Sequence, residues 1–94
     1  MYKRQVNDRL KLKLFPNPAK DYTTVEFNLE VGEPVDITII DMQGRMIRNL
    51  RNQEFFNSGN HSLLINTSHL ENGQYFLNVR GKRHNYISSL IVQQ

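Results

Sequence analysis

The side chains best suited to metal binding or acid–base catalysis are spread widely along this 94-residue sequence. The three histidines, His61, His69 and His84, show neither HxH nor HExxH spacing, the close pairings that are typical of zinc sites. The acidic residues show no spacing that requires two of them to act as a catalytic pair. The sequence therefore predicts no metal site, and it predicts structural roles for the histidines.

The sequence also lacks the residues and motifs on which several other kinds of catalysis depend. It contains no cysteine, which excludes disulfides, thiolate metal sites and cysteine nucleophiles. No Gly-x-Ser-x-Gly motif, phosphate-binding loop or dinucleotide-binding glycine pattern is present. We therefore expect no catalytic residue and no bound cofactor.

Composition and charge indicate one small folded domain. Hydrophobic residues make up 38% and aromatic residues 10% of the chain, which is more apolar material than a disordered segment carries. The net charge of +3 is small and scattered, so no nucleic-acid partner is expected. Residues 1–9 are interpreted as a polar linker from an upstream region, without the apolar stretch of a signal peptide, and residues 10–94 as the domain.

Alternation of apolar and polar residues runs through the sequence and indicates β-strands. Val25, Phe27 and Leu29, for example, fall on one face of a strand, while Glu26 and Asn28 fall on the other. The segments with this period are 10–15, 22–29, 35–41, 45–50, 61–66, 74–80 and 85–92. These seven short segments predict an all-β fold, an antiparallel immunoglobulin-like β-sandwich of about seven strands.

Two of the connections contain residues that restrict the backbone. Pro16 and Pro18 flank Asn17, and because proline fixes φ and has no N–H, this segment is expected to be a stiff, extended connector. Asp41 followed by Gly44 predicts a type I turn closed by a glycine with positive φ.

Two further connections are predicted from composition. Residues 51–60 are mostly polar and are expected to cross one end of the domain, where Phe55 or Phe56 would cap the core. Residues 67–74 are expected to form a single helical turn from which Leu70 points into the core.

A basic turn is predicted between the last two strands. Arg80, Lys82, Arg83 and His84 surround Gly81 in this segment. The ordinary interpretation is a solvated turn, and the alternative is a contact with phosphate or lipopolysaccharide.

Several short motifs, taken in order, resemble a known family. FPNPAKD, DMQGR, SGNH and LENGQYFLNV are followed by a basic turn and a short apolar terminal strand. This order is similar to that of the C-terminal type A sorting domain of the bacterial type IX secretion system, and it runs from about Leu12 to Gln94. The matching positions, which we interpret as mainly structural, are Pro16, Asn17, Pro18, Asp41, Gly44, Arg45, Gly59, His61, Gly73 and Tyr75.

The resemblance implies that the chain acts as an address label on a secreted cargo. Such domains follow the cargo, cross the periplasm, and are recognised by outer-membrane components of the type IX system, namely its translocon, shuttle and sortase-like proteins. Many are then cleaved off, and the cargo is anchored at the cell surface or released. The domain itself is not expected to be an enzyme.

The resemblance also points to two candidate recognition segments. Family members often carry a lysine at the end, whereas this chain ends in LIVQQ, which leaves Lys82 and Arg83 as the nearest basic candidates. The other candidate is the apolar segment Leu90, Ile91 and Val92. A final strand at a sheet edge would offer unpaired N–H and C=O groups to a partner strand, and it would also permit self-association.

Two other functions remain open at this point. A small sandwich can be a carbohydrate-binding or adhesion module, which requires aromatic rings on one exposed face. The rings to consider are Tyr22, Phe55, Phe56 and Tyr86. An accessory domain that stabilises a neighbour would instead show a large apolar patch.

Overall fold

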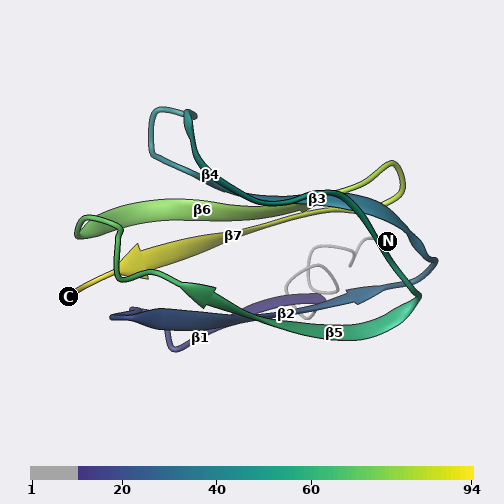
Figure 1. Ribbon diagram of the computed structural model, residues 1–94, viewed down its shortest axis with the longest axis horizontal. Helices are drawn as coiled ribbons and strands as arrows, with labels where there is room; N and C mark the ends of the chain where they lie inside the picture. The colour runs from purple at the N-terminus through teal and green to yellow at the C-terminus, as the bar shows by residue number, and fades with distance from the viewer. Residues whose placement is uncertain (1–10) are drawn as a thin grey trace, which may run out of the picture.

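Seven β-strands make up most of residues 11–94, the part of the chain that the computed structural model describes (Figure 1). They are β1 (Leu12–Phe15), β2 (Tyr22–Leu29), β3 (Glu33–Ile40), β4 (Met46–Phe56), β5 (Gly59–Asn66), β6 (Gly73–Arg80) and β7 (Asn85–Val92). The all-β fold expected from the sequence is confirmed. The interpreted linker, residues 1–9, and Leu10 lie outside the described residues.

The strands form two sheets that face each other (Figure 1). One sheet has the order β1-β2-β5 and the other the order β4-β3-β6-β7. All neighbouring strands pair antiparallel. The expected antiparallel β-sandwich is thus confirmed.

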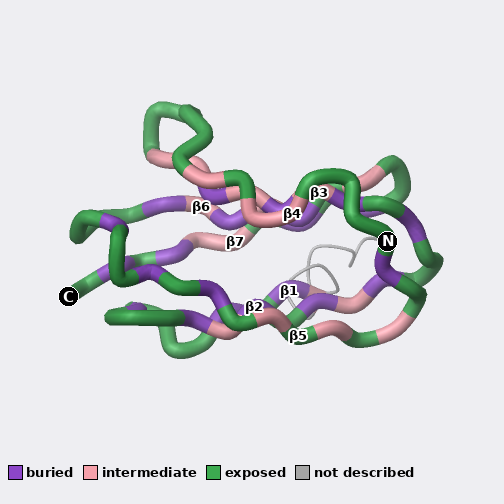
Figure 2. The backbone as a smooth tube through the Cα atoms, in the orientation of Figure 1, coloured by how far each residue is buried: buried purple, intermediate pink, exposed green. Residues whose placement is uncertain are grey.

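The core lies between the sheets and follows the predicted alternation. Strands β2, β3 and β6 each place every second side chain inward, so purple and pink or green segments alternate along them in Figure 2. The fully buried residues at the centre are Val25, Val35, Ile37, Ile39, Leu77, Val79 and Leu90. Burial of these side chains is the main source of stability in a domain without disulfides.

Strand β4 is longer than the sequence predicted. The segment expected to cross the end of the domain continues along β3, where Phe56 pairs with Glu33 and Phe55 with Pro34. The pairing contains register shifts, and Gln53 has a φ of 53°, so the apolar residues lose the simple alternation that marks a strand. Phe56 is buried and caps the core as expected of one of the two rings, whereas Phe55 is exposed.

The segment after β5 is a tight turn. Leu70 N–H donates to the Thr67 carbonyl over 3.1 Å, and Leu70 is buried as predicted. Thr67 is buried too, and its hydroxyl donates to the Lys20 carbonyl. This bond ties the turn to the connector between β1 and β2.

The two open sides of the sandwich differ. On one side the edge strands are β1 and β7, which lie beside each other, and Ala19 forms a parallel bridge with Val92. On the other side the edges are β4 and β5, which appear in front of their sheets in Figure 1. The candidate recognition segments of the sequence lie on and next to β7.

Candidate functional site

The Pro16-Asn17-Pro18 connector runs along the outer edge of β7. Asn17 Nδ2 donates to the Ser89 carbonyl, and Ile91 N–H donates to Asn17 Oδ1, each over 2.9 Å. The flanking prolines have no N–H to offer, so the side-chain amide supplies the donor and the acceptor that a neighbouring strand would supply from its backbone.

Ala19 continues this cover of the β7 edge. Its N–H donates to the Ile91 carbonyl and its carbonyl accepts from Gln93 N–H, both over 2.8 Å. Asn17 and Ala19 together therefore pair the outward backbone groups from the Ser89 carbonyl to the Gln93 N–H. The methyl group of Ala19 is fully buried, so the connector is also packed against the core.

This cover changes the expected role of the last strand. Leu90 and Val92 are core residues, at 0% and 1% exposure, and only Ile91 shows its side chain to solvent. Both backbone groups of Ile91 are occupied. The expectation that this segment offers unpaired backbone to a partner strand is wrong for the folded domain, because the connector already fills that place.

The residues after β7 are held as well. Gln94 N–H donates to Asn72 Oδ1 over 2.8 Å, and Gln94 Nε2 donates to the carbonyls of Thr67 and Leu70. A shallow hollow beside them is lined by Pro16, Pro18, Lys20, Asp21, Tyr22, Gln93 and Gln94. The C-terminal strand is thus held along its edge from Ser89 onward and after its end.

The basic turn between β6 and β7 is built on a buried carboxylate. Glu33, at the start of β3, accepts hydrogen bonds from the N–H groups of Lys82, Arg83 and His84 over 2.8–3.1 Å. His84 Nδ1 donates to the same carboxylate over 2.6 Å, and Glu30 N–H donates to His84 Nε2. Three successive N–H groups that point at one anion form an anion-binding nest, and in this protein the Glu33 carboxylate occupies it.

The charge of Glu33 is stabilised by this arrangement. Burial raises its pKa, but the hydrogen bonds from His84 Nδ1 and from the Arg83 and Lys82 N–H groups outweigh burial, so the pKa lies below its usual value. A Cβ at Gly81 would collide with the Glu33 carboxylate, so the turn needs a residue without a side chain at this position. The carboxylate therefore sets the shape of the turn.

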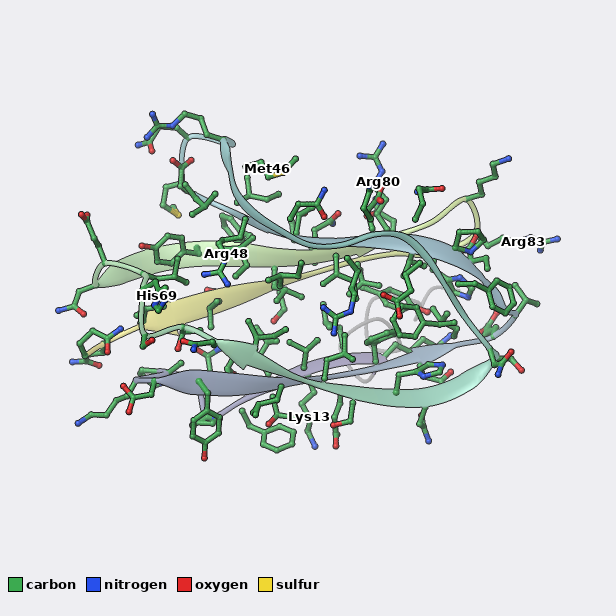
Figure 3. The ribbon with its side chains drawn as sticks, viewed as in Figure 1. Lys13, Met46, Arg48, His69, Arg80 and Arg83 are labelled. Atoms are coloured by element: carbon green, nitrogen blue, oxygen red, sulfur yellow. The ribbon has the colours of Figure 1, made fainter. Side chains whose placement is uncertain are left out.

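The cations of the turn point away from this buried centre. Arg80, Lys82 and Arg83 are exposed, and in Figure 3 Arg80 and Arg83 point outward in different directions. The lysine and arginine salt bridges within residues 11–94 involve Lys11, Arg45 and Arg51 instead. A hollow next to the turn is lined by Val31, Gly32, Glu33, Pro34, Asp36, Gln53, Arg80, Gly81, Lys82 and Arg83. The turn thus presents positive charge on a rigid base, without converging on one point.

The Asp41 motif forms the predicted hairpin. Asp41 Oδ1 accepts from the N–H groups of Gln43 and Arg45, and its Oδ2 accepts from Arg45 Nε, all over 2.9 Å. The hydrogen bond from the Arg45 N–H is the main reason that the pKa of Asp41 is lowered. Gly44 has a φ of 87°, which an L side chain rarely adopts. Asp41, Gly44 and Arg45 thus shape the link from β3 to β4.

The Gly59 and His61 motif supports one end of the core. Gly59 begins β5 with a φ of 115°. The His61 ring packs against the rings of Phe27 and Phe56, at centroid distances of 5.3 Å and 5.0 Å, and the two phenylalanine rings also contact each other. His61 Nε2 donates to the Asn57 carbonyl. His61 therefore acts as a packed aromatic residue that also holds the β4–β5 loop.

Tyr75 has a structural position too. It is buried at the start of β6, which begins at Gly73, and its hydroxyl donates to the Glu71 carbonyl over 2.7 Å. Burial, together with the nearby charges of Glu71 and Asp41, raises the pKa of Tyr75. The motif residue thus ties the turn before β6 to the core.

The four rings considered from the sequence, Tyr22, Phe55, Phe56 and Tyr86, do not form an aromatic platform on one exposed face. Phe56 and Tyr86 are buried. Tyr22 and Phe55 are exposed, but they belong to different sheets. The carbohydrate-binding interpretation thus loses the observation that would have supported it best.

The histidines do not gather. His61, His69 and His84 lie on β5, in the turn after it and at the end of the basic turn. Among residues 11–94, no three side chains of the metal-binding types lie close enough to hold an ion. The same residues contain no helix long and apolar enough to cross a membrane.

Glu33 and Ala19 are the two contributors that the sequence analysis missed. Glu33 contacts residues 49 to 51 positions later in the chain, and Ala19 contacts residues at its far end. No local pattern marks either residue. A carboxylate beside a proline at a strand start is common, and an alanine after a proline carries no signal.

Comparison with known proteins assigns the chain to a family. Residues 13–93 match the family described as the secretion system C-terminal sorting domain, which covers most of the chain and includes every motif described above. No curated protein matches the sequence. The chain therefore belongs to the secretion system C-terminal sorting domain family, and it is a C-terminal secretion signal for type IX secretion.

Proposed function

We propose that this domain is read in its folded form by the outer-membrane components of the type IX system, after the cargo has entered the periplasm. The domain follows a cargo and directs it to the cell surface or the medium, as its family indicates. The observation that carries the proposal is the cover of β7 by Asn17 and Ala19, which leaves the folded strand no free backbone at Ile91.

The partner would then read side chains. Lys82 and Arg83 stand on the turn that Glu33 holds, and Ile91, 41% exposed, lies on the strand that follows. Long basic side chains on a fixed turn attract acidic groups of a partner and speed its encounter with them. A sortase-like protease of the system would then separate the cargo from the domain at a site ahead of the β-sandwich. In this proposal the domain has no catalytic role.

The test is export of a fluorescent reporter fused ahead of the 94-residue chain, in a bacterium that has the type IX system. We expect the intact fusion to reach the medium or cell surface. A Lys82→Glu, Arg83→Glu double variant should reduce export. The matched control is Lys20→Glu, Arg48→Glu, which makes the same charge change on other elements.

Point variants are needed because β7 is part of the core. Deleting residues 90–94 would remove the buried Leu90 and Val92 and would unfold the domain. Ile91→Ser tests the strand instead, and Ile87→Ser, 60% exposed on the same strand, is its control. Retention of the intact fusion inside the cell would contradict the sorting role. If both charge variants are exported to the same extent, the basic turn does not take part in recognition.

A further inference from the structure

Three of the four edge strands have features that protect at least part of the strand against pairing with another chain. β1 has four residues and leads into Pro16, and the end of β7 is covered by the connector. β4 pairs through register shifts and carries Arg48 and Arg51. Short length, proline, bulges and charge are features that keep a sheet edge from accepting a further strand.

β5 has none of these features. Its eight residues include no Lys, Arg, Asp, Glu or Pro, and each pairs with a residue of β2 without a register shift. It is also one of the two edge strands of its sheet. A regular, uncharged edge of this kind is a template for another strand.

The backbone groups that face the open side of β5 can be identified. Thr67 N–H donates to the Asp21 carbonyl, one position beyond the Tyr22–Asn66 pair. Hydrogen-bonded and non-bonded pairs alternate along an antiparallel ladder, so every second residue of β5 turns its N–H and C=O outward. These residues are Asn60, Ser62, Leu64 and Asn66. Within residues 11–94, the hydrogen bonds from side chains to the backbone are made to other residues than these four.

An exposed apolar side chain stands at the same edge. Leu64 is 70% exposed, more than any other large hydrophobic residue among those described. It shares the outer face of the sheet with Phe15, since both lie opposite Thr24. A second strand placed next to β5 would cover part of this apolar surface.

We propose that β5 is the docking edge for a second copy of this chain, with the two β5 strands antiparallel about a two-fold axis. A two-fold axis at Leu63 brings Ser62 opposite Leu64 of the second copy and Asn60 opposite its Asn66. The outward backbone groups of each copy then meet those of the other. A second copy fits better than a charged partner strand. The charges of such a partner would find no opposite charge on β5, whereas two uncharged β5 strands do not repel each other. The proposal does not depend on the sorting function.

The test is sedimentation velocity of the 94-residue chain over a range of concentrations. We expect a monomer–dimer equilibrium for the unaltered chain. Leu64→Lys places like charges near each other across the paired strands, so the dimer dissociation constant should rise at least about tenfold. Ile87→Lys makes the same change at a residue of β7 that is 60% exposed, and it should leave the equilibrium unchanged. Circular dichroism verifies that both variants fold.

Three outcomes would overturn the proposal. The first is a chain that stays monomeric at every concentration, and the second is an equal effect of the two lysine variants. In the third, the chain is monomeric but Leu64→Lys reduces export of the reporter fusion while Ile87→Lys does not. That result would assign the edge to a strand of a secretion partner. Export of the fusion despite a failed dimer test would leave the sorting function intact.

Discussion

At the scale of the residue, Glu33 shows how one buried charge organises a surface turn. Glu33 is 7% exposed, and its carboxylate accepts hydrogen bonds from four donors, three backbone N–H groups and the His84 ring. An isolated buried carboxylate would destabilise the fold, but a fully hydrogen-bonded one supports it. Lys82 and Arg83 therefore stand on a turn whose shape is set from inside the protein.

Glu33→Gln should destabilise the domain and weaken its response to acid. The pKa of Glu33 lies below the unfolded value of 4.5, so the carboxylate contributes stability that is complete above that pH and is lost as the pH falls through the folded pKa. At neutral pH the variant should lose about 2 kcal/mol, since a neutral amide is a weaker acceptor for these donors. Urea denaturation between about pH 7 and pH 3 measures both effects.

Glu26→Gln is the matched control for this prediction. Glu26 is exposed on the outer face of β2, so its substitution should change stability little. If both variants lose the same stability with the same pH profile, the nest at Glu33 does not support the turn.

At the scale of the element, the connector between β1 and β2 works as a short cover strand for β7. A peptide backbone in that place would offer alternating donors and acceptors, but Pro16 and Pro18 have no N–H to donate. Asn17 replaces the missing groups with its amide, and Ala19 resumes backbone pairing. An asparagine is suited to this place because its amide both donates and accepts, whereas an ionised aspartate only accepts.

Asn17→Asp should therefore weaken the cover of β7. The carboxylate can still accept from Ile91 N–H, but its other oxygen would face the Ser89 carbonyl without a hydrogen between them. We expect a loss of about 1 kcal/mol in urea denaturation and faster hydrogen exchange at the amides near Ile91. Asn52→Asp, on the exposed part of β4, is the control, and it should change neither the stability nor the hydrogen exchange near Ile91. Unchanged exchange in Asn17→Asp would contradict the role assigned to the amide.

At the scale of the whole molecule, stability depends on one thin core shared by both sheets. The domain has no disulfide, and its buried side chains come from every strand. A single domain of this size has a net stability of only about 5–15 kcal/mol. One well-placed cavity can therefore remove a large part of it.

Leu77→Ala should produce such a cavity. Leu77 is fully buried on β6, which pairs with β3 on one side and β7 on the other. The substitution should cost about 2–5 kcal/mol and lower the melting temperature by at least about 8 °C. Leu64→Ala, at a residue that is 70% exposed, should change the melting temperature by far less. The measurement is thermal unfolding followed by circular dichroism. Equal melting temperatures for the two variants would contradict the placement of Leu77 in the core.

Much of this protein was determined by the sequence alone. The strand faces of β2, β3 and β6, the Asp41–Gly44 hairpin and the family could all be predicted, because alternation and turn chemistry depend on residues close in the chain. The continuation of β4 could not, since bulges hide the alternation.

The tertiary structure decided what the edges and the basic turn present. Asn17 meets Ser89 and Ile91 from 72 and 74 positions away, and Glu33 meets the basic turn from about fifty. Such contacts close only when both sheets have formed, and no local pattern of residue types specifies them. For the same reason the sequence pointed to the end of β7 as a free edge, whereas in the folded domain the connector covers β7 from Ser89 to its end, and β5 is an open edge.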